Sequence, residues 1–199
     1  IPMPMNAELQ IETHANAGTF PGRVAVIIYD QIGAFTLGVA LEVFGRALPD
    51  EGYPAYDLSI VSAEGRSVSA FGGMRISATA GMAELRQARI ILIPAWRSNH
   101  ERPPEKLLSE LRRAAARGAI LVSICDGAFV HAGLLDGRRA TTHWADLDDL
   151  KSQFPDVRAE DDVLYVDEGN IITSAGGASG IDACLHLVRR DFGTRVANA

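Results

Sequence analysis

The chain has 199 residues, of which 47% are hydrophobic and 22% charged, so it is long enough to bury a core and does not have a disordered composition. Its formal net charge of −6 and the lack of a basic stripe make it a poor candidate for gripping nucleic-acid phosphates. Its two cysteines lack metal-ligand spacing, which disfavours a structural zinc site, and two cysteines are too few for a disulfide framework. No apolar run has the length of a membrane span.

Residues 1–22 carry neither the basic nor the apolar region of a signal peptide, and we expect them to form a flexible tail. The lack of targeting signals and the sparing use of cysteine indicate a reducing compartment, the cytoplasm. The remaining residues, 23–199, are expected to form one domain.

Strand and helix patterns alternate along this domain. Residues 23–29 form a near-continuous apolar run, which is typical of a buried parallel strand. The spacing of apolar residues predicts a helix over 34–47 and a second strand over 56–63. Residues 70–79 contain two adjacent glycines and predict a small hairpin.

The middle of the chain repeats the alternation. A buried strand is predicted over 89–96, followed by a polar loop. The helix predicted over 103–118 has a proline in its first turn, an apolar stripe and a glycine at its end. A strand over 119–124 then leads into a helix over 126–134.

The last third begins with a short extended segment at 138–143 and a helix over 144–154. Residues 163–176 predict two short strands around a tight turn. The final helix is predicted over 179–193, with Ser179 as its cap.

Strands that alternate with helices imply βαβ units and a mostly parallel sheet covered on both faces. In such sheets, ligands bind beyond the carboxyl ends of the strands. Cys184 shares the apolar side of the final helix with Ile181, Leu185 and Val188, so we expect it in the core.

Cys125 stands where the strand over 119–124 gives way to a helix, which is the position of a nucleophile at a sharp strand-to-helix turn. Helix-start N–H groups favour a thiolate there, and Gly127 allows close approach, whereas the adjacent Asp126 carboxylate opposes ionisation. His143 is a partner only if the fold brings it near. From spacing alone, Cys125 is either a nucleophile or a buried small apolar residue, and His143 is either a base or a satisfied polar side chain.

Four segments carry a family resemblance that covers the chain from about Arg23 to its end. The run "SICDGAFVHAGLLDGRRATTHW" closely resembles the cysteine-to-histidine block of the ThiJ/PfpI superfamily, which has the class I glutamine-amidotransferase-like fold. Within the superfamily, one branch is most similar to the second half of that run, "GLLDGRRATTHW", and to the runs "VAVIIYDQIGAFTLGVALEVFG", "ILIPAWRS" and "VLYVDEGNIITSAGGASGIDACLHLVRRDFGTRVANA". That branch is the N-terminal sensor domain of GlxA/FtrA-type AraC-family transcriptional regulators.

The resemblance implies a flavodoxin-like three-layer α/β sandwich with a mostly parallel central sheet and a Cys nucleophile elbow, commonly as a dimer. Enzymes of the superfamily use the elbow cysteine, which matches Cys125, and the histidine of "TTH" matches His143. The acid that usually hydrogen-bonds the cysteine is replaced by Thr36, which cannot be a general acid near neutral pH. Asp126 replaces a usual Thr or Ser, and the stretch "AFVHAGLL" is about two residues short, which indicates a remodelled pocket.

The resemblance therefore predicts a ligand-sensing and dimerisation domain of a transcriptional regulator. Asp126 would suit a small polar or cationic metabolite. No cofactor or metal is expected, the partner is a second copy of the chain, and membrane contact is not expected. DNA binding is expected only through helix-turn-helix units beyond Ala199. The expected ligand-binding residues are Thr36, Trp96, Cys125, Asp126, Gly127 and His143.

The alternative is a Cys-dependent hydrolase, amidase or isonitrile-hydratase-like hydro-lyase. In that case Cys125 attacks, His143 assists and N–H groups at the turn stabilise the developing charge. A third possibility is a redox-sensing or purely structural module in which Cys125 oxidises without a substrate.

Overall fold

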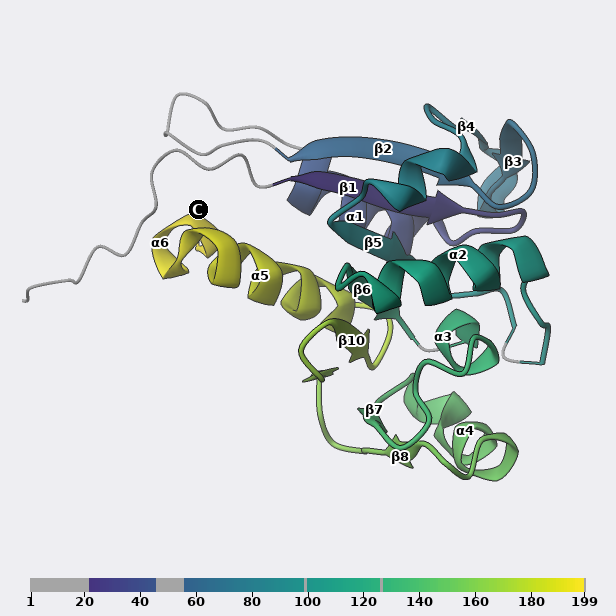
Figure 1. Cartoon of the computed structure of the whole chain (residues 1–199), viewed down its shortest axis with the longest axis vertical. Helices are drawn as coiled ribbons and strands as arrows, with labels where there is room; N and C mark the ends of the chain where they lie inside the picture. Colours follow the sequence, from purple (N-terminus) through teal and green to yellow (C-terminus); the bar gives the residue numbers. More distant parts are fainter. Residues whose placement is uncertain (1–21, 46–55, 99, 126, 199) are drawn as a thin grey trace, which may run out of the picture.

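The structure is a computed structural model that describes residues 22–45, 56–98, 100–125 and 127–198. The predicted N-terminal tail, except Gly22, lies outside the described residues, and so does Asp126. The architecture is mixed α/β with a mostly parallel central sheet, as the sequence predicts (Figure 1).

Six strands of the described residues form the main sheet, in the order β2-β1-β5-β6-β10-β9. All neighbours run parallel except β9 and β10, which are antiparallel. In the register, Val26 of β1 lies opposite Ile60 of β2 and Leu92 of β5. These strands are β1 (Arg23–Ile28), β2 (Asp57–Ser62), β5 (Ile90–Ile93), β6 (Ile120–Ile124), β9 (Tyr165–Asp167) and β10 (Ile171–Ser174).

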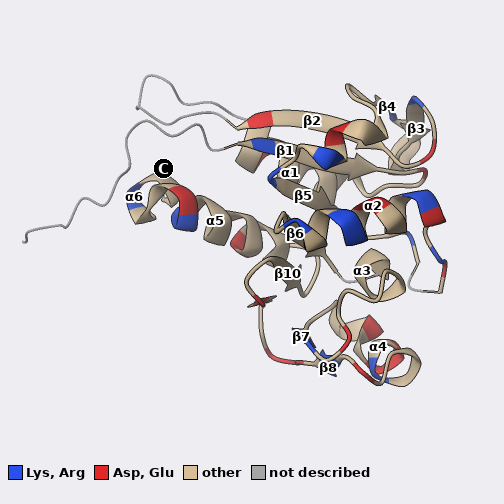
Figure 2. Cartoon of the chain, viewed as in Figure 1, with Lys and Arg blue, Asp and Glu red and all other residues tan. Residues whose placement is uncertain are grey.

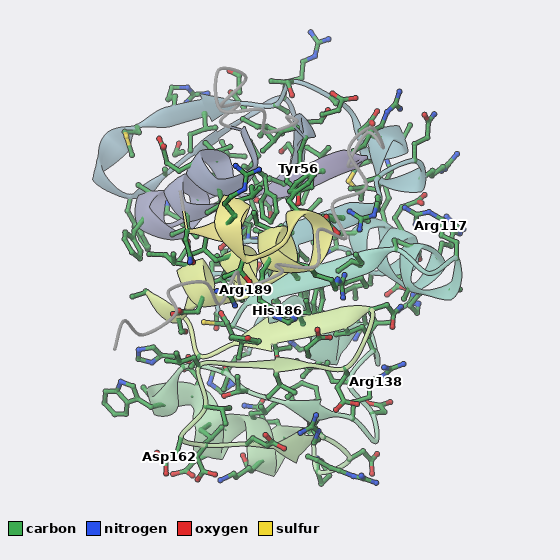
Figure 3. The ribbon with its side chains drawn as sticks, turned by 90° about the vertical axis from the view of Figure 1, so that its left-hand side faces the viewer. Tyr56, Arg117, Arg138, Asp162, His186 and Arg189 are labelled. Atoms are coloured by element: carbon green, nitrogen blue, oxygen red, sulfur yellow. The ribbon has the colours of Figure 1, made fainter. Side chains whose placement is uncertain are left out.

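Helices cover both faces of this sheet. Figure 3 shows α1 and α5 on one side of the strands and α2 on the other. The chain between the strands also forms two small sheets, the predicted hairpin β3-β4 and the parallel pair β7-β8. The helices and minor strands are α1 (Ala34–Gly45), β3 (Ser67–Ser69), η2 (Phe71–Gly73), β4 (Arg75–Ser77), η3 (Met82–Arg86), α2 (Glu105–Ala116), α3 (Gly127–His131), β7 (Arg139–Ala140), η4 (Trp144–Asp146), α4 (Leu147–Gln153), β8 (Arg158–Ala159), α5 (Ser179–Phe192) and α6 (Thr194–Ala197).

The central strands are buried along their whole length. Every residue of β5, β6 and β10 is buried, which is why these segments read as continuous apolar runs rather than as alternating patterns. Cys184 is also fully buried, as predicted from its place on α5. Ile181, which shares the apolar side of this helix, is 36% exposed.

Several boundaries differ from the prediction for local reasons. The strand β5 stops at Ile93 because Ala95 adopts a left-handed backbone with φ of +67°. The helix α3 is short because Gly133 turns the chain with φ of +68°. Residues 144–154 begin as the 3₁₀ turn η4 and become α-helical only at Leu147.

The predicted cap at Ser179 is also wrong. Ser179 is the first residue of α5, and its hydroxyl donates to the carbonyl oxygen of Gly176 at 2.6 Å instead of accepting from a helix N–H. The predicted stop is confirmed, because Gly193 has φ of +83° directly after the helix. The sequence patterns did not predict the strand β8 or the helix α6.

Charges of both signs are interspersed on the surface. Figure 2 shows acidic and basic residues alternating along α2 and near the end of α5. Among the described residues, none of the helices is long and apolar enough to cross a membrane.

Candidate functional site at the carboxyl edge of the sheet

Four parallel strands, β1, β5, β6 and β10, end at the same edge of the sheet. From β1 the chain first goes to β2 on one side and later returns to β5 on the other. The strand order therefore reverses between β1 and β5, and such a reversal opens a crevice beyond the carboxyl ends of the strands. The loops after these strands carry the candidate residues.

Cys125 directly follows β6, and α3 begins two positions later at Gly127. Its backbone is left-handed, with φ of +76°, and its N–H donates to the carbonyl oxygen of Ser174 at 3.1 Å. This conformation is unfavourable for a residue with a Cβ, so the packing of β6 against β10 holds it in place. The side chain is partly exposed, whereas Gly127 is buried.

Gly176, in the loop after β10, lies between Cys125 and His143. A Cβ placed on Gly176 would stand 2.7 Å from the Cys125 Sγ and 3.5 Å from the Cβ and Cδ2 of His143. The fold thus brings Cys125 and His143 around one point, as the sequence analysis requires for a pair. Gly176 was missed there, although the glycines at 176 and 177 are a signal of close backbone approach.

His143 is fixed by the turn that follows it. Its Nδ1 accepts the backbone N–H of Ala145 at 3.3 Å, so the neutral ring carries its proton on Nε2. In that tautomer Nε2 donates a hydrogen bond and does not accept a proton. The ring centroid lies 5.4 Å from that of Trp144, whose side chain is 81% exposed.

Thr36 takes part in a hydrogen-bond cluster on the carbonyl oxygen of Pro94. Its hydroxyl lies 3.2 Å from the carbonyl oxygens of Pro94 and Gly33, and the Tyr29 hydroxyl donates to the same Pro94 oxygen at 3.0 Å. Burial, followed by the negative charge of a Cys125 thiolate, raises the pKa of Tyr29 above its ordinary value. Tyr29 therefore stays protonated and donates, and the hydroxyl proton of Thr36 is already shared between carbonyl oxygens.

Trp96 is packed between two neighbours in this region. Its ring centroid lies 4.6 Å from that of Tyr29, and the guanidinium carbon of Arg97 lies 5.1 Å from the ring centroid. The residue is only 6% exposed. Trp96 was expected as a ligand contact; in the structure it is buried against Tyr29 in the loop after β5.

Arg97 joins three loops of this edge. Its guanidinium donates to Glu64 after β2 at 2.6 Å, to Glu101 at 2.7 Å and to the carbonyl oxygen of Asp30 after β1 at 3.2 Å. Hydrogen bonds from Arg97 are the main reason that the pKa values of both Glu64 and Glu101 lie below their ordinary value. The sequence analysis missed this ion-pair cluster, because Glu64 lies 33 positions away from Arg97 in the chain.

Within the described ranges, no group of three or more His, Cys, Asp or Glu side chains could hold a metal ion. The expectation of a metal-free and cofactor-free site stays a prediction, because Asp126 lies outside the described residues.

Residues 22–190 match the model of the DJ-1/PfpI family. The chain belongs to this family. This finding agrees with the predicted ThiJ/PfpI resemblance and covers the whole of the candidate site.

Two curated relatives point in different functional directions. The chain is 32% identical over 144 residues to the HTH-type transcriptional regulator CdhR of Pseudomonas aeruginosa, covering 71% of this chain and 43% of the relative. It is 38% identical over 95 residues to isonitrile hydratase of Pseudomonas putida, covering 47% of this chain and 40% of the relative. This family member thus spans less than half the length of either relative.

A crystal structure of an AraC family transcriptional regulator from Pseudomonas putida shares the fold. Its TM-score is 0.74 at 22% sequence identity, over 89% of this chain and 96% of that chain. At this identity the likeness supports the fold of this DJ-1/PfpI domain alone.

Proposed function

We propose that this chain is the ligand-sensing and dimerisation domain of an AraC-family transcriptional regulator and that it binds a small metabolite beside Cys125. The similarity to the regulator CdhR over 71% of the chain supports the regulatory role. The domain acts in the cytoplasm and reaches DNA only through helix-turn-helix units that follow Ala199. The ligand-binding residues in this proposal are Thr36, Trp96, Cys125, Asp126, Gly127 and His143.

The observation that carries the proposal is the hydrogen bonding of Thr36. Enzymes of the superfamily usually have an acidic residue at the position that Thr36 occupies in this chain. The Thr36 hydroxyl is directed at the carbonyl oxygens of Pro94 and Gly33. A threonine hydroxyl is too weak an acid to serve as a general acid near neutral pH. His143 adds to this argument, because its Nδ1 is occupied by Ala145 and its Nε2 is left as a donor. The crevice is thus better equipped to recognise a molecule than to shuttle protons.

The ligand in this proposal is a small polar or cationic metabolite. Arg97 is paired with two carboxylates, Glu64 and Glu101, so this cluster carries one excess negative charge. In the sequence, Asp126 adds a further carboxylate next to Cys125. A cation approaching this edge is therefore attracted. To regulate, the ligand must bind two arrangements of the protein with different affinities.

Dimerisation is proposed to use the surface between α1 and α5. A hollow of about 360 Å³ lies there, and its lining is apolar except for Glu42. Phe35 stands at this hollow with 58% of its surface exposed, and Ile181 is 36% exposed. A patch that offers both a protruding ring and a hollow suits the self-complementary contact of a two-fold dimer. The lining residues are Phe35, Gly38, Val39, Glu42, Val43 and Ile181.

The test of the regulatory role has two stages. Sequencing the gene past the codon for Ala199 should reveal two helix-turn-helix units in frame. A thermal-shift screen of amines and amino acids should then raise the unfolding temperature, since a ligand at 100 times its Kd stabilises by about 2.7 kcal/mol, or roughly 5–10 °C for a domain of this size. His143→Ala should abolish the shift. A frame that stops at once, together with a screen without any binder, would overturn the proposal.

A Cys-dependent enzyme is the second candidate, and two observations favour it. The chain is 38% identical to isonitrile hydratase over 95 residues that make up 47% of the chain, and Cys125 has a left-handed backbone between a strand and a helix with His143 close by. An activated nucleophile would be alkylated at neutral pH faster than a free thiol, whose pKa is about 8.5. An alkylation rate no faster than that of a free thiol would exclude this candidate. A faster rate would call for substrate assays that compare the wild type with Cys125→Ser.

A further inference from the structure

Four buried side-chain polar atoms in the described ranges have no hydrogen-bond partner, and all belong to the segments that form the candidate site. Buried groups of this kind are few in native proteins and each calls for an explanation. Ser123 precedes Cys125 by two positions, Ser174 precedes Gly176 by two, and Thr142 directly precedes His143. The atoms are Trp96 Nε1, Ser123 Oγ, Thr142 Oγ1 and Ser174 Oγ.

Trp96 differs from the other three in its chemistry. A hydroxyl both donates and accepts and rotates to suit its surroundings, whereas an indole N–H only donates and points in a fixed direction. Only an acceptor oxygen or nitrogen therefore satisfies Trp96. The residue is 6% exposed and its Nε1 is enclosed by protein, so the required acceptor is not bulk water in this arrangement.

The loop that carries Trp96 is strained next to it. Ala95 has a left-handed backbone with φ of +67°, and its N–H donates to the carbonyl oxygen of Ile93 at 2.8 Å. The neighbouring loops after β1 and β6 are strained in the same way, at Gln31 and Cys125. Non-glycine residues in this region are rare and concentrate at functional sites. The unpartnered donor and the strain thus meet in one loop at the β1–β5 crevice.

The surroundings of Trp96 determine which acceptor fits. Arg97 lies against the ring, but its guanidinium is engaged by the carboxylates of Glu64 and Glu101. One positive charge against two negative charges leaves the neighbourhood acidic, which repels a ligand carboxylate. A neutral carbonyl oxygen accepts a hydrogen bond without that repulsion.

We propose that the Trp96 indole N–H donates to a neutral carbonyl oxygen, of an amide or an ester, in the ligand of this site. The inference rests on the proposed function, because it names the chemical group that the sensed molecule presents between β1 and β5. Since the N–H is enclosed, binding requires the loop after β5 to shift, and this loop contains the left-handed backbone of Ala95.

The test observes the indole proton itself. The chain has two tryptophans, so Trp144→Phe, which replaces an 81% exposed ring, leaves one indole N–H signal in a ¹⁵N-labelled protein. This variant is titrated in parallel with N-methylacetamide, acetate and tetramethylammonium chloride. We expect N-methylacetamide to move the Trp96 signal downfield to saturation, acetate to act more weakly, and tetramethylammonium to leave it in place. Trp96→Phe should weaken the binding of N-methylacetamide about tenfold, since one hydrogen bond is lost. The affinity of this variant is measured from the backbone amide signal of Gly176.

Three outcomes would overturn the inference. In the first, the indole proton signal already lies downfield before any probe is added, because a trapped water accepts its hydrogen bond. In the second, all three probes shift the signal equally. In the third, none of the probes shifts it. These results are separable from a failure of the regulatory role. If the gene lacks the helix-turn-helix units but N-methylacetamide shifts the indole signal to saturation, the regulatory role is rejected and the ligand site at Trp96 is retained. If amines raise the unfolding temperature but leave the indole signal in place, the regulatory role is retained and the role of Trp96 is rejected.

Discussion

The backbone of Gly176 passes so close to Cys125 that a Cβ added at residue 176 would lie 2.7 Å from the Cys125 Sγ. The same added atom would lie 3.5 Å from His143. The absence of a side chain at Gly176 is therefore what lets the thiol and the imidazole share one space. The backbone there is left-handed as well, with φ of +76°, which favours glycine a second time.

Gly176→Ala should destabilise the chain by about 2–3 kcal/mol, of which about 1 arises from the left-handed backbone and the rest from crowding against Cys125. Urea unfolding measures the loss. Gly72→Ala is a matched control, because Gly72 has φ of +80° but no heavy atom within 4 Å of an added Cβ. It should lose only about 1 kcal/mol. Equal losses for the two variants would mean that the contact with Cys125 does not matter.

Iodoacetamide at pH 8 should label Cys125 and leave Cys184 unmodified in the folded protein. Burial raises the pKa of the Cys184 thiol to about 12, so about one molecule in ten thousand carries the thiolate at that pH. Cys125 is partly exposed. Mass spectrometry of the tryptic peptides distinguishes the two sites. Both should be labelled in denaturant, and labelling of Cys184 without denaturant would contradict its place in the core.

Arg97→Gln should cost about 1–2 kcal/mol at pH 7, because it breaks charge-assisted hydrogen bonds to Glu64 and Glu101. The pKa values of both carboxyl groups are lowered from 4.5 in the folded state, so the unfolded chain binds these protons more readily. The stabilisation is therefore complete above pH 4.5 and is lost as the pH falls through the lowered values. Unfolding of the wild type and the variant at several pH values should show the gap closing in acid.

Arg139→Gln is the control for this pH series. Arg139 also pairs with two glutamates, Glu160 and Glu168, but its side chain is 52% exposed. Exposed pairs contribute little, so the stability of this variant should stay close to that of the wild type at any pH. A gap between the wild type and Arg97→Gln that does not narrow at all as the pH falls below 4.5 would show that Arg97 acts by packing on Trp96 instead of by charge.

Phe35→Asp should convert the proposed dimer into a monomer, because a carboxylate would be buried in the apolar hollow between α1 and α5. Size-exclusion chromatography with light scattering measures the mass. Phe71→Asp is the matched control, since Phe71 is 63% exposed but does not line the hollow. A wild-type chain that is monomeric at every concentration, or a dimer that survives Phe35→Asp, would contradict the assignment of this surface.

The sequence alone determined the order of most strands and helices in the described part of the chain. Buried parallel strands such as β6 require unbroken apolar runs, and a helix such as α2 requires a stripe of apolar residues, so both leave local patterns. The same local reading identified Cys125 at a strand-to-helix junction. The motif around it pointed to the DJ-1/PfpI family, which the match over residues 22–190 confirms.

Only the tertiary structure decided how these segments meet. Ala95 ends β5 early, and Ser179 bonds Gly176 instead of capping α5, although the local sequence permits the predicted alternative in both places. A backbone angle or a hydrogen-bond partner depends on which chain segment lies opposite, and that is fixed by the order of strands in the sheet. The glycines at 176 and 177 signal a close backbone approach, but the sequence does not say that Cys125 is the residue approached. That contact and the missing partner of the Trp96 N–H are relations between segments that only packing brings together.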